Sequence, residues 1–218
     1  MKAPSSRSDT AILLIRHGET LWNRAGRVQG WQDSPLTDIG CAQAAALAER
    51  LSGERIERLI ASDLGRARQT AAPIASRLGI AIECDSGLRE RNYGIFEGRT
   101  YAEIEREDPE AYAYLARRDP AYAIPGGESG AAFGVRVRGA LERIAAAHAG
   151  HRIAVVAHGG VLGVLYRHAV QQTPGAQGDY SLANASVNHV RFGAGRWTIE
   201  QWGDVAHLAQ DSADDAIE

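Results

Sequence analysis

Four short segments of the sequence carry the residue types that phosphoryl transfer requires. They are Arg16-His17-Gly18, the stretch from Ser62 to Arg66, the loop that contains Glu90, and His158-Gly159-Gly160. A phosphomonoester carries roughly −1.5 to −2 charge near neutral pH, and its transfer depends on groups that neutralise three phosphoryl oxygens. The planar guanidinium of arginine fits those oxygens, and a neutral histidine can attack phosphorus. The four segments together therefore favour phosphoryl-transfer chemistry.

The residue types also suggest how the work would be divided. One histidine attacks and the other supports, and nearby arginines lower the pKa of the attacking ring because they disfavour imidazolium. The leaving alkoxide needs a proton, and an acid beside the site can supply it and later take one from water. Glu90 is the acid that we expect to serve both steps.

Each of the four segments directly follows a predicted strand. The strands are the apolar runs at 11–15 (AILLI), 58–61 (RLIA), 80–84 and 152–157 (RIAVVA). Capping residues and apolar spacing predict helices from Thr37 to Leu51, from Ser62-Asp63 to about Leu78, from Ser129 to about Ala149, and from the 158–160 segment to His168. The stretch from Tyr101 to Arg118 is also helical in pattern, but more polar, with Asp108-Pro109 as a cap and first-turn pair. Two further strands, 186–192 and 197–202, alternate around a Gly-Ala-Gly turn and predict an antiparallel pair at the sheet edge.

Strands that alternate with helices predict an α/β fold, a three-layer α/β/α sandwich around a mostly parallel central sheet. In such sheets ligands bind outside the carboxyl ends of the strands, so we expect the four segments to converge on one edge. We expect one catalytic domain over 11–208, a disordered leader over 1–10 and a flexible acidic tail over 209–218.

The composition narrows the classes of partner. The chain has 218 residues, is 44% hydrophobic and 23% charged, and has a formal net charge of −3 and a pI near 6.2. That balance disfavours binding to nucleic acid or to a membrane surface, and the longest apolar stretch, 153–166, is shorter than the ~20 residues of a membrane span. With no export signal, we expect a cytoplasmic protein, either a monomer or a homodimer.

The cysteines and the histidine spacing predict no metal or other cofactor. Cys41 and Cys84 are the only cysteines, and neither lies in a Cys-x-x-Cys pair. The one His-x-x-His spacing, His148 and His151, lies outside the four segments, and arginines beside His17 and His158 would repel a divalent cation. The glycines after His158 imitate a dinucleotide-binding loop, but His158 stands where its first glycine is required.

At these residues the sequence resembles the histidine phosphatases related to cofactor-dependent phosphoglycerate mutase. The resemblance extends from the first strand almost to the end, and its motifs, in the family's order, are Arg16-His17-Gly18-Glu19-Thr20, Trp22-Asn23, Ser34-Pro35-Leu36-Thr37 with Gly40, Ser62-Asp63-Leu64 with Arg66-Ala67, Gln69-Thr70-Ala71, Leu88 with Glu90, Tyr93-Gly94, Glu97-Gly98, Gly127-Glu128-Ser129 and His158-Gly159.

The resemblance implies a phosphoglycerate mutase-like fold and a role for each matched residue. It implies that His17 is phosphorylated, that Arg16, Arg66 and His158 hold the phosphoryl oxygens, and that Glu90 is the proton donor. By the same likeness, the side chain of Asn23 and the backbone of Gly159 contact phosphate, and Glu19, Glu97 and Glu128 orient their neighbours. We add Gln29, Gly30 and Tyr93 as candidates for the substrate pocket, and we assign Arg68 to the surface because of its helical spacing from Arg66.

Three functions share this set of residues. The leading hypothesis is a metal-independent phosphatase that hydrolyses small phosphomonoesters through a phosphohistidine. The second is a phosphoglycerate mutase, although the stretch from Glu90 to Gly127 is too short for the insertion that true mutases of the family carry. The third is a phosphoprotein-binding module without activity. The tyrosines at 101, 112, 114 and 122 either pack or line a substrate lid, and the sequence leaves both open.

Overall fold

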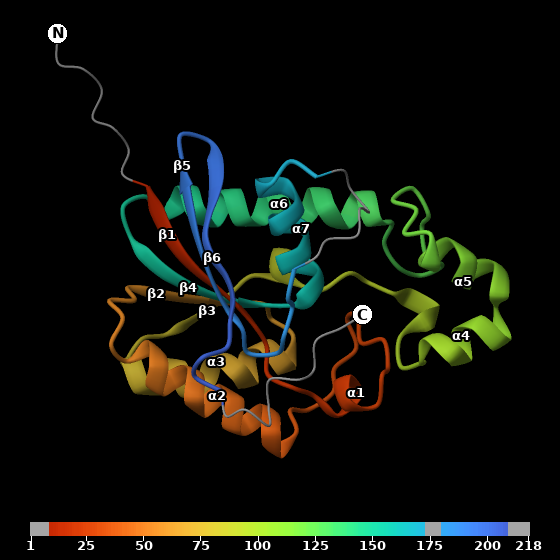
Figure 1. The fold of residues 1–218 in the computed structure, drawn as a ribbon, viewed down its shortest axis with the longest axis horizontal. Coiled ribbons are helices and arrows are strands. Elements are labelled where there is room, and N and C mark those ends of the chain that lie inside the picture. The colour runs from red at the N-terminus through yellow and green to blue at the C-terminus, as the bar shows by residue number, and fades with distance from the viewer. Residues whose placement is uncertain (1–8, 173–179, 209–218) are drawn as a thin grey trace, which may run out of the picture.

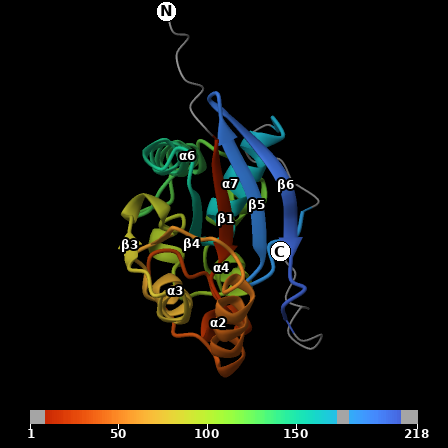
Figure 2. The same cartoon turned by 90° about the vertical axis from the view of Figure 1, so that its left-hand side faces the viewer.

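The computed structural model describes residues 9–172 and 180–208 and shows a central sheet with helices on both sides (Figure 1). Its strands are β1 (Thr10–Arg16), β2 (Arg58–Ala61), β3 (Ile82–Cys84), β4 (Arg152–Ala157), β5 (Val187–Gly193) and β6 (Arg196–Asp204). Their order across the sheet is β3-β2-β4-β1-β5-β6, and Figure 2 shows them side by side from β3 to β6. The first four are mutually parallel, whereas β5 and β6 are antiparallel, as the sequence predicts.

The helices form two layers and a separate group. They are α1 (Leu21–Arg24), α2 (Asp38–Leu51), α3 (Gly65–Leu78), α4 (Tyr101–Glu107), α5 (Pro109–Ala116), α6 (Gly130–Ala147) and α7 (Gly159–Ala169). In Figure 1, α2 and α3 lie below the sheet, α6 and α7 lie above it, and α4 and α5 lie to one side. The chain is thus a three-layer α/β/α sandwich with a small helical extension.

The central strand β1 shows why its apolar residues run without alternation. Leu13 and Ile15 pack into the core between the sheet and helices α2 and α3. Ile12 and Leu14 pack into the core on the opposite face, between the sheet and helices α6 and α7. A strand covered on both faces has no polar side to present. The run therefore ends only where the chain leaves the sheet, at Arg16.

Local capping fixes most helix ends where the sequence places them. The hydroxyl of Thr37 accepts from the N–H of Gly40 at the start of α2, and Ser129 accepts from Ala132 at the start of α6. At the end of α3, Gly79 adopts φ 66°, a left-handed conformation that glycine takes without penalty. The third strand begins at Ile82, two residues after the predicted start.

The predicted start of α3 is wrong, and the reason bears on the site. Neither Ser62 nor Asp63 caps this helix; its first residue is Gly65, and Leu64 at the cap position offers no side-chain acceptor. The carboxylate of Asp33, from a distant loop, accepts from the N–H of Gly65 instead. The hydroxyl of Ser62 therefore does not cap α3 and is available to bond to a different residue.

The extension formed by α4 and α5 has its own small core around Phe96 and Ile104. Tyr112 and Tyr122 pack against this core, so packing accounts for two of the four tyrosines. Tyr101 lines a cavity of about 210 Å³ together with Tyr112, Leu115, Ala116 and Arg118.

The two ends of the predicted domain lie largely outside the described residues. Residues 1–8 of the predicted leader and the whole predicted tail, 209–218, are not among them, and Thr10 is the buried first residue of β1 rather than part of a leader. Over the ranges that the structure covers, none of the helices combines the length and apolarity needed to cross a membrane.

Candidate active site

The candidate nucleophile, His17, is the first residue after β1. Its N–H bonds to the carbonyl of Ala157 at the end of the neighbouring strand β4, at 3.0 Å, which fixes the backbone at the sheet edge. Its ring Nδ1 lies 2.8 Å from the carbonyl oxygen of Gly18. A carbonyl can only accept, so Nδ1 carries the proton, and in the neutral ring Nε2 keeps its lone pair.

The surroundings of His17 keep the ring neutral. The side chain is almost fully buried, and desolvation holds its pKa well below the usual value, assisted by the positive charges of Arg66 and Arg16. Each of these causes penalises imidazolium. The ring of His17 is therefore uncharged beside two guanidinium groups, which is the state expected of a nitrogen nucleophile.

The second histidine, His158, lies at the end of β4, and its ring centroid is 5.3 Å from that of His17. Its Nε2 lies 2.8 Å from the hydroxyl of Ser62, which was predicted to cap α3 and does not. Burial again lowers its pKa far below the usual value, followed by the charge of Arg66. Within the described residues its Nδ1 is buried and has no hydrogen-bond partner.

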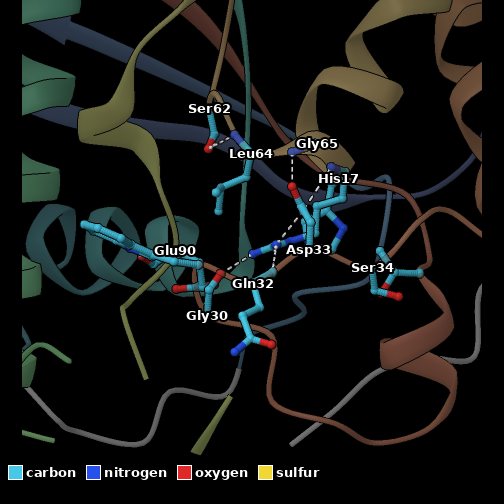
Figure 3. Close-up of polar contacts among 12 residues, drawn as sticks. His17, Gly30, Gln32, Asp33, Ser34, Ser62, Leu64, Gly65 and Glu90 are labelled. Atoms are coloured by element: carbon cyan, nitrogen blue, oxygen red, sulfur yellow. Dashed lines mark hydrogen bonds and ion pairs between the residues drawn. The ribbon is translucent and has the colours of Figure 1, made fainter. Parts of the chain in front are cut away.

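Arg66, in the first turn of α3, is a fully buried guanidinium. Its Nη1 donates to Asp33 and to the carbonyl of Gln32, both at 3.0 Å, and its Nη2 donates to the carbonyl of Gly30 at 2.8 Å. Its Nε is buried and meets no acceptor among the residues that the structure describes. The three residues that accept these bonds, Gly30, Gln32 and Asp33, are labelled in Figure 3. Arg68, two positions later, is exposed, as the helical spacing predicts.

Glu90 faces the start of α7. Its Oε2 accepts from the N–H of Gly160 at 2.8 Å, and its Oε1 accepts from the N–H of Arg91 at 2.7 Å. A Cβ added to Gly160 would lie 2.0 Å from Oε1, so a side chain there would displace the carboxylate. The second glycine after His158 is thus explained by the approach of Glu90.

The loop that carries Glu90 is held from two sides. The indole of Trp31 donates to the carbonyl of Glu90 at 2.8 Å, and the guanidinium of Arg136, on α6, donates to the same oxygen at 3.1 Å. Arg136 also donates to the carbonyls of Gly87 and Arg89. The acid is therefore positioned through its backbone as well as through its carboxylate.

The remaining predicted residues differ in how they contribute. Arg16 donates to the carbonyl of Leu182, and Gly159 packs against its guanidinium, with an added Cβ at 3.5 Å from Nε. The Oδ1 of Asn23 accepts from the N–H and the hydroxyl of Thr20 at 3.1 and 3.0 Å, which turns its NH₂ group away from the turn.

The three residues predicted to line the substrate pocket, Gln29, Gly30 and Tyr93, have different surroundings. Gly30 has φ 56°, and its missing side chain leaves room for Glu97, whose Oε1 would be 2.0 Å from an added Cβ. Gln29 is buried, and its Oε1 contacts no donor in the described part of the chain. Burial raises the pKa of the Tyr93 phenol, and the charge of Glu90 adds to the rise.

Two of the three expected framework acids orient loops of the site. Glu97 accepts from the backbone N–H groups of Trp31, Gln32 and Tyr93, and so ties two loops together. Glu128 receives two hydrogen bonds from Arg136, at 2.8 and 2.7 Å. The third, Glu19, is buried and accepts from Arg24 and from the hydroxyl of Thr37, the N-cap of α2.

Four contributing residues were missed from the sequence: Asp33, Ser62 as a partner of His158, Arg136 and Asn184. Ser62 and Asp33 lie inside or beside recognisable segments, but their partners are 96 and 33 residues away along the chain. Arg136 is one of several arginines on a helix, and nothing in its spacing distinguishes it. Asn184 donates to the carbonyl of His17 at 2.9 Å from the far end of the chain.

The donor set of the site is cationic and imidazole-rich. Across residues 9–172 and 180–208, no group of three or more histidine, cysteine, aspartate or glutamate side chains is arranged to hold a metal ion. The buried Nε of Arg66 is a donor without an acceptor among the described residues, and the guanidinium lies close enough to the neutral imidazole of His17 to lower its pKa. Buried donors require acceptors, and the oxygens of a phosphoryl group are the acceptors that guanidinium binds best.

Comparisons with known proteins agree with this chemistry. "Phosphoglycerate mutase-like protein 4" of Arabidopsis thaliana is 43% identical over 91% of this chain and 87% of its own length. "Metal-independent phosphoserine phosphatase" of the same plant is 42% identical over 92% of this chain and 84% of its own length. The solved structure of YhfR from Bacillus stearothermophilus superposes with a TM-score of 0.86 at 33% identity, covering 92% of this chain and all of that one.

The sequence model of one family, described as "Histidine phosphatase superfamily (branch 1)", matches residues 12–205. That range begins in β1 and ends just after β6, and it includes every segment of the site described above. The chain belongs to branch 1 of the histidine phosphatase superfamily, and its relatives support a phosphatase or mutase activity.

Proposed function

We propose that this chain is a metal-independent phosphatase that hydrolyses small phosphomonoesters through a phosphohistidine at His17. The observation that carries the proposal is the neutral His17 ring, protonated at Nδ1, which presents the lone pair of Nε2 beside two arginines. A nucleophile of this kind needs no metal to generate it, because burial and the two positive charges already keep it deprotonated.

The first step transfers the phosphoryl group to the protein. The Nε2 lone pair forms the new N–P bond as the P–O bond to the leaving group breaks, and protonated Glu90 delivers its proton to the departing oxygen. Arg16 and Arg66 neutralise the charge on the equatorial oxygens and His158 donates a hydrogen bond to one of them, a stabilisation that acts most strongly in a buried site. The Nε of Arg66 supplies a donor that the described protein leaves unused.

The second step returns the phosphoryl group to water. Glu90, now a carboxylate, takes a proton from the water molecule, whose oxygen bonds to phosphorus while the N–P bond breaks. Inorganic phosphate leaves, and the neutral ring of His17 and the protonated acid are restored. One acid thus serves both half-reactions, as microscopic reversibility requires.

The mutase reaction is a second candidate, because a relative named as phosphoglycerate mutase-like is 43% identical. It uses the same groups but returns the phosphoryl group to a bound acceptor before water reaches it. Hydrolysis is favoured because the stretch from Glu90 to Gly127, in which α4 and α5 are both short, has no room for the insertion that true mutases of the family carry. Interconversion of 3- and 2-phosphoglycerate that outpaces phosphate release, with and without the bisphosphate, would reverse this order.

The decisive experiment looks for the covalent intermediate. Wild-type enzyme quenched during turnover of p-nitrophenyl phosphate should carry an acid-labile phosphoryl group on His17, found by mass spectrometry at neutral or alkaline pH. The His17→Ala variant should form no adduct and release no phosphate, while His168→Ala, which changes an exposed histidine, should behave as wild type. Phosphate release by His17→Ala, or an adduct on another side chain, would refute the proposal.

Substrate identity needs a separate screen. A panel of phosphoglycerates, phosphoserine, sugar phosphates and nucleotides, scored by kcat/KM for phosphate release, tests the substrate class. Phosphoserine belongs in it because a relative that is 42% identical is named for that activity. We expect small esters to be preferred over large ones.

A further inference from the structure

Asn184 lies between the backbone of the nucleophile loop and a side chain of the phosphate site. Its Nδ2 donates to the carbonyl oxygen of His17 at 2.9 Å and lies 3.4 Å from Oδ1 of Asn23. The side chain is buried, with 3% of its surface exposed. We propose that Asn184 is a positioning residue that orients both His17 and Asn23, an inference that rests on the proposed function of His17.

The orientation of the Asn184 amide follows from its neighbours. The backbone N–H of Thr20 bonds to Asn23 through Oδ1, so that atom is an oxygen. The carbonyl of His17 is an acceptor as well. Two acceptors face one end of the Asn184 side chain, and only its NH₂ group can satisfy them.

The first consequence concerns the ring of His17. The peptide between His17 and Gly18 is held at both ends: Asn184 and the N–H of Ala185 donate to its carbonyl, and its N–H donates to the hydroxyl of Thr70 at 2.9 Å. This peptide leads to the Gly18 carbonyl that takes the Nδ1 proton. Fixing the peptide therefore fixes the tautomer that leaves Nε2 free to attack.

The second consequence concerns Asn23. Its Oδ1 is surrounded by three donors, two from Thr20 and one from Asn184. With the oxygen held in this way, the NH₂ group must face the opposite direction. Loss of the Asn184 donor would weaken the preference, so the amide could rotate and present an oxygen to a phosphoryl anion.

The chain segment around Asn184 is built to hold this position. Leu182 accepts from the guanidinium of Arg16, so the same segment also holds a phosphate-binding arginine. Ala185 is fully buried and has φ 57°, which is uncommon for a residue other than glycine. Trp202 donates from its indole to the carbonyl of Ser181 at 3.0 Å, which anchors the segment to β6.

A matched control is available four residues later. Asn188 is also fully buried, and its Nδ2 donates to a backbone carbonyl of β1, that of Leu14, at 3.0 Å. It accepts from the N–H of Gly203 and contacts neither His17 nor Asn23 in the described structure. Asn188→Ala should therefore cost the fold a comparable amount without acting on the site.

The test measures the reaction and the tautomer separately. For Asn184→Ala we expect the single-turnover rate of phosphohistidine formation to fall about tenfold to a hundredfold, as small misplacements of reacting groups do. The Ki of inorganic phosphate should rise severalfold through Asn23. In ¹⁵N spectra of the free protein, the His17 ring should change from one neutral tautomer, protonated at Nδ1, to a mixture of both. Asn188→Ala should leave all three readings at wild-type values.

An isosteric variant separates positioning from simple loss of packing. Asn184→Asp keeps the shape but replaces the donor with a second acceptor, so we expect kcat to fall at least as far as in Asn184→Ala and the acid limb of the kcat/KM profile to move to higher pH. Wild-type rates and a single tautomer in both variants would overturn the inference. If wild-type enzyme itself forms no phosphohistidine, the proposed function fails, whereas the ring spectra still report on Asn184.

Discussion

The carboxylate of Asp33 bonds at once to the backbone N–H of Gly65, at the start of α3, and to the guanidinium of Arg66, one residue later. A single side chain from the loop after α1 therefore both caps the helix and orients the arginine that it carries. Figure 3 shows Asp33 beneath Gly65 with the contact drawn. The position of Arg66, the arginine that we propose binds phosphate, thus depends on a loop that is remote in the sequence.

Asp33→Ala should weaken both the fold and the binding of phosphate. Loss of the cap should lower the free energy of unfolding by about 1 kcal/mol, and KM for a phosphomonoester should rise severalfold because Arg66 loses one of its fixed partners. Asp33→Asn, which keeps an acceptor for Gly65, should retain most of the stability. Urea denaturation and initial rates give the two quantities.

The control for Asp33 is a cap that does not touch Arg66. Ser129→Ala removes the N-cap of α6, where the hydroxyl accepts from Ala132 at 3.1 Å. It should lower stability by a similar amount and leave KM unchanged. An Asp33→Ala enzyme with wild-type KM would show that Arg66 is held adequately by the two backbone carbonyls alone.

The buried histidines predict how stability depends on pH. The pKa values of His17 and His158 lie well below 6.5 in the folded protein, chiefly through desolvation, so below about pH 6.5 the unfolded chain binds more protons. The free energy of unfolding should therefore fall as pH decreases from about 6.5, by about 1.4 kcal/mol per pH unit for each ring. Above pH 7 both rings are neutral in the folded and the unfolded chain, so neither should make stability depend on pH.

Removing one ring isolates its contribution. In His17→Asn, denaturation between pH 5 and 7 should show a slope smaller than that of wild type by about 1.4 kcal/mol per pH unit. In wild-type enzyme, kcat/KM should persist below pH 6.5, since the nucleophile stays neutral there. An unchanged slope in His17→Asn would mean that this ring is protonated in the folded state.

How much of this could be predicted from the sequence depends on the range of each interaction. The run 11–15 predicts β1, and the cap at Thr37 predicts α2, because the signals lie within a few residues of one another. The convergence of His17 and His158 also follows, since parallel strands end at one edge. The start of α3 does not, because its cap comes from Asp33, and no local pattern encodes a contact across 32 residues.

The hydroxyl of Ser62 should determine the tautomer of His158. When it donates to Nε2, the remaining proton of the neutral ring lies on Nδ1, which then becomes a donor for a phosphoryl oxygen. Ser62→Ala should lower the free energy of unfolding by about 1–3 kcal/mol, because a buried nitrogen loses its partner, and should raise the Ki of inorganic phosphate severalfold.

Ser34→Ala is the matched control for Ser62. Ser34 is also a buried serine, and its hydroxyl accepts from the N–H of Trp22 at 3.1 Å, away from His158. Its loss should affect stability without affecting the Ki of phosphate. Equal Ki values for the two variants would show that the hydroxyl of Ser62 acts on the fold alone.

Arg136 should influence the reaction through Glu90, and the leaving group reveals this. It donates to the Glu90 carbonyl at 3.1 Å, so Arg136→Lys, which loses the forked geometry, should leave the acid poorly placed. An alkyl phosphate needs the proton and should lose about tenfold in kcat, whereas p-nitrophenyl phosphate, whose leaving group departs unprotonated, should lose much less. Arg143→Lys, on the same helix but paired with Asp85, should change neither rate. If Arg136→Lys slows both substrates equally, the guanidinium supports the phosphate site or the fold as a whole and does not act through the acid.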